Sequence, residues 1–191
     1  MRTKAAYLWN KVSRIGLRDD EGVLEFREVI FLNRLLAIMP LVLLIYIPLE
    51  IYFNGYSMLP VVLIMIFFFL VPLPLHYFRL FRLAHYFTFI AANLLITMAG
   101  IMVGKGVNNH VALIPIVLVG IIVFKTTGER ILAFFITVAF FVMQQYLLDI
   151  IPPVTIVAPG TKPVFSFIFF VMSLFLSFLV GFYFIRINNE Y

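Results

Sequence analysis

Six polar side chains lie toward one end of otherwise apolar segments, and their types are suited to binding a ligand or an ion. They are Glu50, Asn93, His110, Gln144, Gln145 and Asp149. Two carboxylates and one imidazole, from Glu50, His110 and Asp149, could together hold a divalent cation such as Mn²⁺, Zn²⁺ or Mg²⁺. The six could instead bind the polar or cationic head group of a small molecule in an apolar pocket. They could also bind nothing, because amides at helix ends hydrogen-bond between helices or meet water and lipid headgroups.

Two histidines, His76 and His85, lie near the opposite end of their segments. A pair of imidazoles could serve as axial ligands of a haem. Arg79 and Arg82 lie close to them in the sequence. We therefore favour the interpretation that these histidines are interfacial residues.

Other reactive patterns are absent from the sequence. It contains no cysteine, which excludes disulfides, thiolate chemistry and cysteine–metal sites. It also contains no nucleophile elbow, no HExxH motif and no pair of aspartates on facing segments. We expect no catalytic residue in this chain, and no cofactor apart from the possible divalent cation.

The elements that must position these residues follow from the composition. Hydrophobic residues make up 64% of the 191 positions and charged residues 12%, whereas soluble domains are roughly half apolar and a quarter charged. This excludes a soluble enzyme, a nucleic-acid-binding domain and a secreted module. The net charge of +5 does not indicate nucleic acid, because membrane proteins concentrate Lys and Arg on their cytoplasmic side.

Apolar segments long enough for a membrane helix of roughly 20 residues recur along the chain, separated by short polar breaks. They predict an all-α polytopic membrane protein whose bundle occupies residues 29–187. The six expected transmembrane helices are 29–53, 58–78, 82–103, 109–125, 129–150 and 163–187.

Residues 1–28 lack the apolar core and cleavage site of a signal peptide. They carry apolar residues at the spacing of one helix face, flanked by Lys and Arg: Ala5, Leu8, Trp9, Val12 and Ile15. This pattern predicts a cytoplasmic amphipathic helix. It could lie on the membrane surface, or it could dock on its own bundle or on a partner domain.

The distribution of basic residues predicts the orientation. With the N-terminus inside, twelve Lys and Arg are cytoplasmic, and only Lys105 and Lys162 are outside. We therefore expect both termini in the cytoplasm and the chain in the inner membrane of a bacterium. No Asp, Glu, Lys or Arg lies near the centre of a span, which argues against a proton relay or a charged ion pathway.

The last segment carries small residues at four-residue spacing, Ser173, Ser177 and Gly181. Small residues at this spacing let another helix approach closely, either from a second copy in a homodimer or from the same bundle. No Gly or Pro follows Gly181, so the helix is expected to continue out of the membrane. We interpret residues 188–191 as the start of a cytoplasmic signalling helix whose output domain is absent from this sequence.

Several features together resemble a known membrane module. They are the basic amphipathic N-terminal segment, six spans with minimal loops, and a fifth span that ends with an acid before a double proline, from Tyr146 through Asp149 to Pro152 and Pro153. This arrangement is similar to the six-helix membrane domain of bacterial class III adenylate cyclases. It also resembles the related domain of quorum-sensing histidine kinases of the cholera-autoinducer type. The resemblance implies a receptor-like dimeric module that regulates a cyclase or kinase, without catalytic residues of its own.

The predicted function is therefore a membrane sensor or regulatory domain. An unknown small-molecule or lipid ligand would change the packing of the bundle, and the sixth helix would carry the change to a cytoplasmic output domain. The alternative is a small stand-alone channel or transporter, which the lack of charge at the centre of the spans disfavours. A membrane enzyme is disfavoured because no catalytic set is visible.

Overall fold

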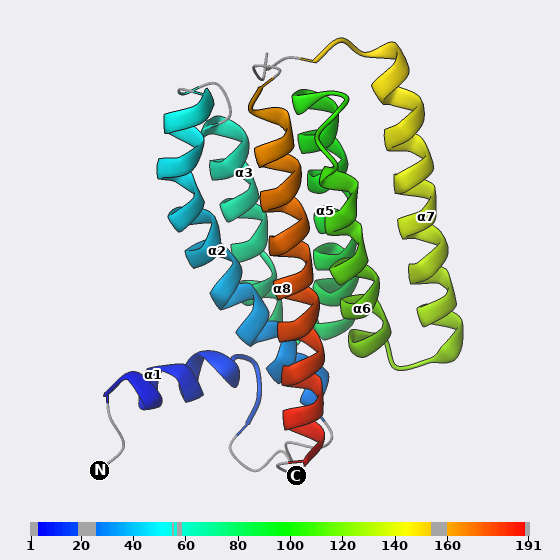
Figure 1. The fold of residues 1–191 in the computed structure, drawn as a ribbon. Helices are drawn as coiled ribbons and strands as arrows, with labels where there is room; N and C mark the ends of the chain where they lie inside the picture. The colour runs from blue at the N-terminus through cyan, green and yellow to red at the C-terminus, as the bar shows by residue number, and fades with distance from the viewer. Residues whose placement is uncertain (1–3, 19–25, 55, 57–58, 154–159, 190–191) are drawn as a thin grey trace.

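The computed structural model describes residues 4–18, 26–54, 56, 59–153 and 160–189. Within these ranges the chain is helical and contains no strand. Figure 1 shows the long helices side by side as one bundle, with the first helix lying across one end, where both chain ends also lie. The helices are α1 (Lys4–Ser13), α2 (Arg27–Asn54), α3 (Leu59–Leu70), α4 (Pro72–Tyr77), α5 (Phe81–Val103), the 3₁₀ helix η1 (Asn109–Ala112), α6 (Leu113–Val123), α7 (Thr127–Ile150) and α8 (Lys162–Asn189).

Among the described residues, five stretches are long and apolar enough to cross a membrane, namely Arg27–Ile45, Leu59–Tyr77, Phe81–Val103, Thr127–Ile150 and Lys162–Arg186. A sixth apolar stretch, Asn109–Val123, is shorter. The all-α prediction is confirmed for the described residues, and these helices include several that could span a membrane. The fourth predicted span is the one whose length falls below that of a membrane-crossing helix.

The fourth span is short because the chain turns back before it becomes helical. The backbone has positive φ at Gly104 (80°) and Gly106 (92°), which glycine adopts easily. Asn109 then lies beside the last turns of α5, where its side chain donates to the carbonyl of Ile96. Non-helical backbone at membrane depth is tolerated where protein buries it. Residues 104–112 therefore use part of the depth that a straight helix would have crossed.

Proline interrupts one predicted span and is accommodated in two others. The second predicted span divides into α3 and α4 just before Pro72, because proline lacks the amide that would continue the helix. Pro40 and Pro48 lie inside α2, which continues through both. Pro115 lies in the first turn of α6, where a missing amide leaves no hydrogen bond unmade.

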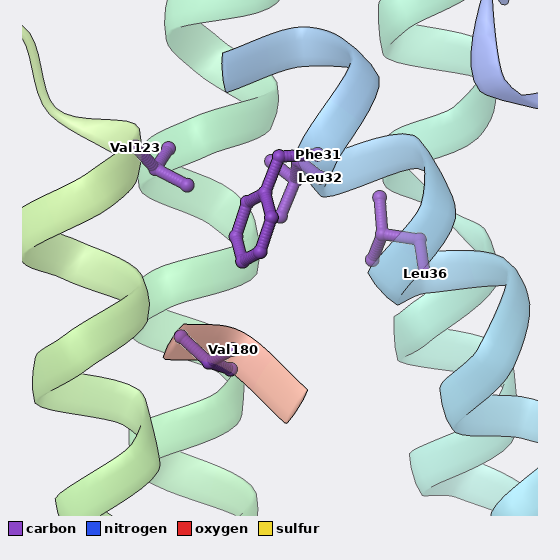
Figure 2. Packing of buried hydrophobic residues seen from close by; sticks show 5 residues of the cluster. All are labelled: Phe31, Leu32, Leu36, Val123 and Val180. Carbon is purple, nitrogen blue, oxygen red and sulfur yellow. The ribbon is translucent and has the colours of Figure 1, made fainter. Parts of the chain in front are cut away.

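Apolar side chains from distant parts of the sequence form the core near the α1 end of the bundle. Figure 2 shows Phe31 and Leu32 of α2 directed toward Val123 of α6 and Val180 of α8, and Leu36 of α2 belongs to the same cluster. All five are buried, so α2, α6 and α8 are held together at this level. A second cluster, of Val103, Val107 and Phe165, joins the end of α5 to the start of α8 at the opposite end.

α7 lies at the edge of the bundle (Figure 1) and packs mainly on α5 and α6. A capping box starts it: Glu129 N donates to Thr126 Oγ1 at 3.2 Å, and Thr126 N donates to Glu129 Oε2 at 3.3 Å. Its buried face consists of Ala133, Thr137 and Gln144. Gln144 is the residue through which α7 makes a buried polar contact with Asn109 of η1.

Candidate functional site

Two amide side chains meet beside a glycine of α5, where η1 and α7 approach that helix. Gln144 Nε2 donates to Asn109 Oδ1 at 2.8 Å, and Asn109 Nδ2 donates to the carbonyl of Ile96 at 3.1 Å. Gly100 makes room for both amides, since a Cβ on it would lie 2.0 Å from Gln144 Nε2 and 2.4 Å from Asn109 Nδ2. We call Gly100, Asn109 and Gln144 the amide junction.

The polar face of α5 continues from the amide junction toward the middle of the helix. Asn93 and Thr97 are one turn apart and have exposed fractions of 0% and 1%. Asn93 Nδ2 donates to the carbonyl of Phe89 at 2.9 Å. Asn93 Oδ1, Thr97 Oγ1 and Gln144 Oε1 are buried without a hydrogen-bond partner in the described part of the chain. Buried polar atoms without partners are rare, so this seam is an unusual feature of an otherwise apolar bundle interior.

The other predicted site residues lie outside this seam. His110, half-buried in η1, contacts the ring of Phe141 with the two ring centroids 5.6 Å apart. Gln145 is exposed on α7, although the adjacent Gln144 is fully buried. Asp149 is exposed and forms an ion pair with Lys105. Glu50 belongs to α2, but its side chain lies outside the described residues.

The predicted cation site of Glu50, His110 and Asp149 therefore stays a prediction. Among the side chains that the structure describes, no three His, Asp or Glu residues lie together as a metal-binding group. Lys105 supplies the positive charge next to Asp149. This end is also held by α8, because Lys162 Nζ donates to the carbonyl of Lys105 at 2.9 Å.

Two adjoining cavities, of about 90 and 170 Å³, lie between the helices and are lined almost wholly by apolar side chains. Both are lined by Met39, Phe69, Ile96, Ala112 and Leu176. The larger extends between α2, α3, α5 and α8 toward the end opposite α1, and the smaller extends toward α6. No charged side chain lines either cavity. We call them together the apolar cavity.

The small-residue face of α8 divides between two environments. Ser173 has an exposed fraction of 3%, lines the larger cavity, and has an Oγ without a partner in the described chain. Ser177 is half-buried. A Cβ on Gly181 would have nothing within 4 Å. Residues spaced by four drift around a helix of 3.6 residues per turn, so Ser173 faces inward while Gly181 does not. The use of this face in a dimer stays a prediction.

A second polar junction connects α1 to the bundle. Asn33 is fully buried, and its Nδ2 donates to the carbonyls of Ser13 and Ile15, each at 3.1 Å. Asn33 Oδ1 lies 2.5 Å from His76 Nδ1. Since the Asn33 amide nitrogen is the donor to both carbonyls, its oxygen accepts and His76 Nδ1 carries the proton.

Both histidines are buried within the protein, and their interfacial position stays a prediction. The exposed fractions of His76 and His85 are 0% and 8%, and their ring centroids lie 5.6 Å apart with nearly perpendicular planes. His76 uses its Nδ1 at the Asn33 junction. Beside His85 lies a polar cavity of about 370 Å³ at the α1 end.

Two ion pairs border this polar cavity. Arg82 Nη2 lies 3.0 Å from Glu129 Oε1, which also accepts a hydrogen bond from Tyr86 Oη at 3.2 Å. Lys125 Nζ lies 2.6 Å from Glu28 Oε1, and Glu28 is buried. Each cation is matched by an acid, so the arrangement joins α2, α5 and α7 at this end rather than forming a site for an anion.

Sequence reasoning named Gln144 and Asn93 as candidate site residues, but it did not name Asn109 and Asn33, whose amides form the buried contacts of the two junctions. A single Asn inside an apolar run was the available signal at position 33, because amides in such runs usually pair with another helix. Comparison with models of known protein families, with curated proteins and with solved structures found no match. The functional argument therefore rests on the cavities and the two junctions.

Proposed function

We propose that this chain is a membrane sensor or regulatory domain in which occupancy of the apolar cavity sets the position of α8. The observation that carries the proposal is that α8 lines the cavity and then continues beyond it. Ser173 and Leu176 line the larger part, and Leu176 and Val180 line the smaller part. The same helix extends to Asn189.

Because α8 is long, a small tilt at the cavity produces a larger displacement at its far end. From Leu176 to Asn189 the helix covers about 20 Å at 1.5 Å per residue. Figure 1 shows its last turns extending past the ends of α6 and α7. An apolar molecule that favours one packing of α8 shifts the population toward that packing, by as much as its affinity for the two packings differs. A tilt of α8 at the cavity would move its far end by about 2 Å, which is typical of helix shifts in regulatory transitions.

The alternative, a channel or transporter, is less well supported. An ion or polar substrate needs charged or polar groups along its path. Among the described residues, no charged side chain lines the apolar cavity, and Thr88 and Ser173 are the only polar ones that do. Thr88 Oγ1 already donates to the carbonyl of Ala84 at 2.8 Å. Ion flux through liposomes containing the protein would favour this alternative.

We further propose that both chain ends face the cytoplasm of a bacterial cell, as the Lys and Arg distribution indicates. The resemblance to cyclase and histidine-kinase membrane domains supports an output domain of one of these kinds, worked by a homodimer. Reporter fusions after Lys105 and after Arg82 test the orientation. The first should report the outside and the second the inside, and the reverse result would exclude it.

The sensor mechanism can be tested without knowing the ligand, because filling the cavity imitates occupancy. Ala99 lines the cavity, so Ala99→Phe would place a phenyl ring inside it. Leu94 lies on the same helix with 38% of its surface exposed, so Leu94→Phe is the matched control. The chain has no cysteine, so spin labels can be attached at Arg79→Cys and Arg186→Cys alone.

Electron–electron distance measurements in nanodiscs should show a shift of about 2 Å or more in the Arg79–Arg186 label distance for Ala99→Phe. Leu94→Phe should leave the distance distribution unchanged. A correctly folded Ala99→Phe variant with the wild-type distribution would show that cavity filling is not coupled to α8, and the proposal would be abandoned.

A further inference from the structure

α1 is held rigidly at one end and crosses the end of the bundle (Figure 1). Asn33 binds the carbonyls of Ser13 and Ile15, and Arg34 Nε donates to Ser13 Oγ at 3.0 Å. The chain turns at Gly16, whose φ is 84° and whose Cβ, if present, would lie 1.9 Å from the carbonyl oxygen of His76. These contacts fix the direction in which α1 leaves the bundle.

The two sides of the apolar stripe on α1 have different surroundings. Trp9 and Val12 are half-buried, toward the side where Ser13 contacts the bundle. Leu8, on the other side of the stripe, has an exposed fraction of 59%. At 100° per residue, Lys4 and Lys11 lie next to Leu8 at the edge of the stripe, and both are exposed. The stripe is therefore only partly covered by the protein.

The charge around the uncovered side is of one sign. Residues 1–18 contain five Lys and Arg and no Asp or Glu. The first acid along the chain is Asp19, which lies outside the described residues. A helix with an apolar stripe edged by basic side chains is suited to the boundary between acyl chains and anionic headgroups. Its orientation across the bundle is the one that a helix in the membrane plane requires.

We propose that α1 binds the surface of the bilayer, with Leu8 in the acyl boundary and Lys4 and Lys11 on the phosphates of anionic phospholipids. The buried Asn33 junction holds the helix at that level. Each basic residue near an anionic surface strengthens binding by about fivefold. The proposal is independent of the apolar cavity and of any output domain.

The test uses the full chain in nanodiscs of phosphatidylcholine, with or without about 30% phosphatidylglycerol. Leu8→Cys provides a site for an environment-sensitive fluorophore in a chain with no other cysteine. Because Leu8 is exposed in the protein, a dry environment for this probe must come from lipid. Asn10→Cys, exposed on the other side of α1, is the matched control.

We expect blue-shifted emission at position 8, quenched by lipids that carry a nitroxide near the glycerol and more strongly so with phosphatidylglycerol. The probe at position 10 should stay accessible to water-soluble quenchers. Adding Lys4→Gln and Lys11→Gln should remove most of the phosphatidylglycerol effect, while Lys105→Gln, at the other end of the bundle, should not.

Trp9, the single tryptophan, gives an independent measurement without a label. Its quenching by the same lipids should follow that at position 8. Equal emission at positions 8 and 10 would overturn the proposal and favour a protein partner for α1. The assignment of anionic headgroups would be overturned if the emission and quenching at position 8 were the same in both lipid mixtures and did not change with Lys4→Gln and Lys11→Gln.

Discussion

Gly100→Ala tests the amide junction with the addition of a single methyl group. The new Cβ would lie 2.0 Å from Gln144 Nε2 and 2.4 and 2.6 Å from the two terminal atoms of Asn109. Such contacts are far inside van der Waals separation, so both amides would have to move. Movement would break the 2.8 Å hydrogen bond between them in a fully buried site.

The expected loss of stability combines three terms. Overpacking a well-filled interior costs about 1–3 kcal/mol. Leaving a buried amide without its partner costs about 1–3 kcal/mol. Alanine is favoured over glycine within a helix by about 1 kcal/mol, which offsets part of this cost. The net destabilisation is roughly 1–5 kcal/mol, which for a chain of this size lowers the unfolding midpoint by roughly 2–20 °C.

The assay is a heat challenge of the detergent-solubilised protein, followed by size-exclusion chromatography of the fraction that remains monodisperse. Gly128→Ala is the matched control, because Gly128 lies in the first turn of α7 and a Cβ there meets nothing within 4 Å. Its midpoint should stay near the wild-type value or rise slightly.

A double variant separates the clash from general weakening of α5. Gln144→Ala removes the atom nearest to the new methyl group, so Gly100→Ala should cost at least about 1 kcal/mol less in its presence. Equal midpoints for Gly100→Ala and Gly128→Ala would refute the proposed packing of the amide junction. Strict additivity of the two changes would show that Gln144 is not the residue that the methyl group displaces.

Three further predictions concern other parts of the molecule. Asn33→Ala should lower the heat-challenge midpoint by several degrees and speed trypsin cleavage after α1, because it removes three hydrogen bonds, two of which are buried. Unchanged cleavage would argue against the anchor. The double variant Ser177→Leu, Gly181→Leu should leave the fold intact, since a side chain at Gly181 has open space around it. It should convert a dimer to a monomer, as measured by the detergent-corrected mass. A mass that stays dimeric would exclude this face as the dimer contact. Wild-type protein should gain heat stability with rising Mn²⁺, and Glu50→Gln or Asp149→Asn should reduce the gain; a wild type indifferent to Mn²⁺ would contradict the cation site.

The positions of the helices could be predicted from the sequence because the hydrocarbon interior of a membrane offers no hydrogen-bond partners to the backbone. Backbone groups in hydrocarbon must be satisfied within the segment, so long apolar stretches can only be helices. The polar breaks at Arg79 and near Lys125 accordingly coincide with the turns between α4 and α5 and between α6 and α7. Basic and apolar residues at helical spacing likewise predicted a helix within residues 1–28, where α1 occurs.

The contents of the interior could not be read in the same way. Asn109 pairs with Gln144 across 35 positions, and Asn33 reaches both Ser13 and His76. In a chain whose helices are apolar on every side, periodicity does not tell a lipid-facing side from a buried one. Gln144 and Gln145 show the difficulty, because these neighbours have the same side chain and yet Gln144 is buried and Gln145 is exposed.

The amino-acid sequence by itself determined that the chain is helical, apolar and divided by short turns. The required length of a span and the need to pair every backbone group without water apply to each segment separately, so each segment can be judged on its own. Tertiary structure decided that the fourth apolar stretch begins as a 3₁₀ turn with Asn109 buried, that Asn33 anchors α1, and that Ser173 of α8 lines a cavity while Gly181 does not. These outcomes depend on the rotation and level of each helix against its neighbours. Those are set by the fit of side chains from distant segments, which no local pattern records.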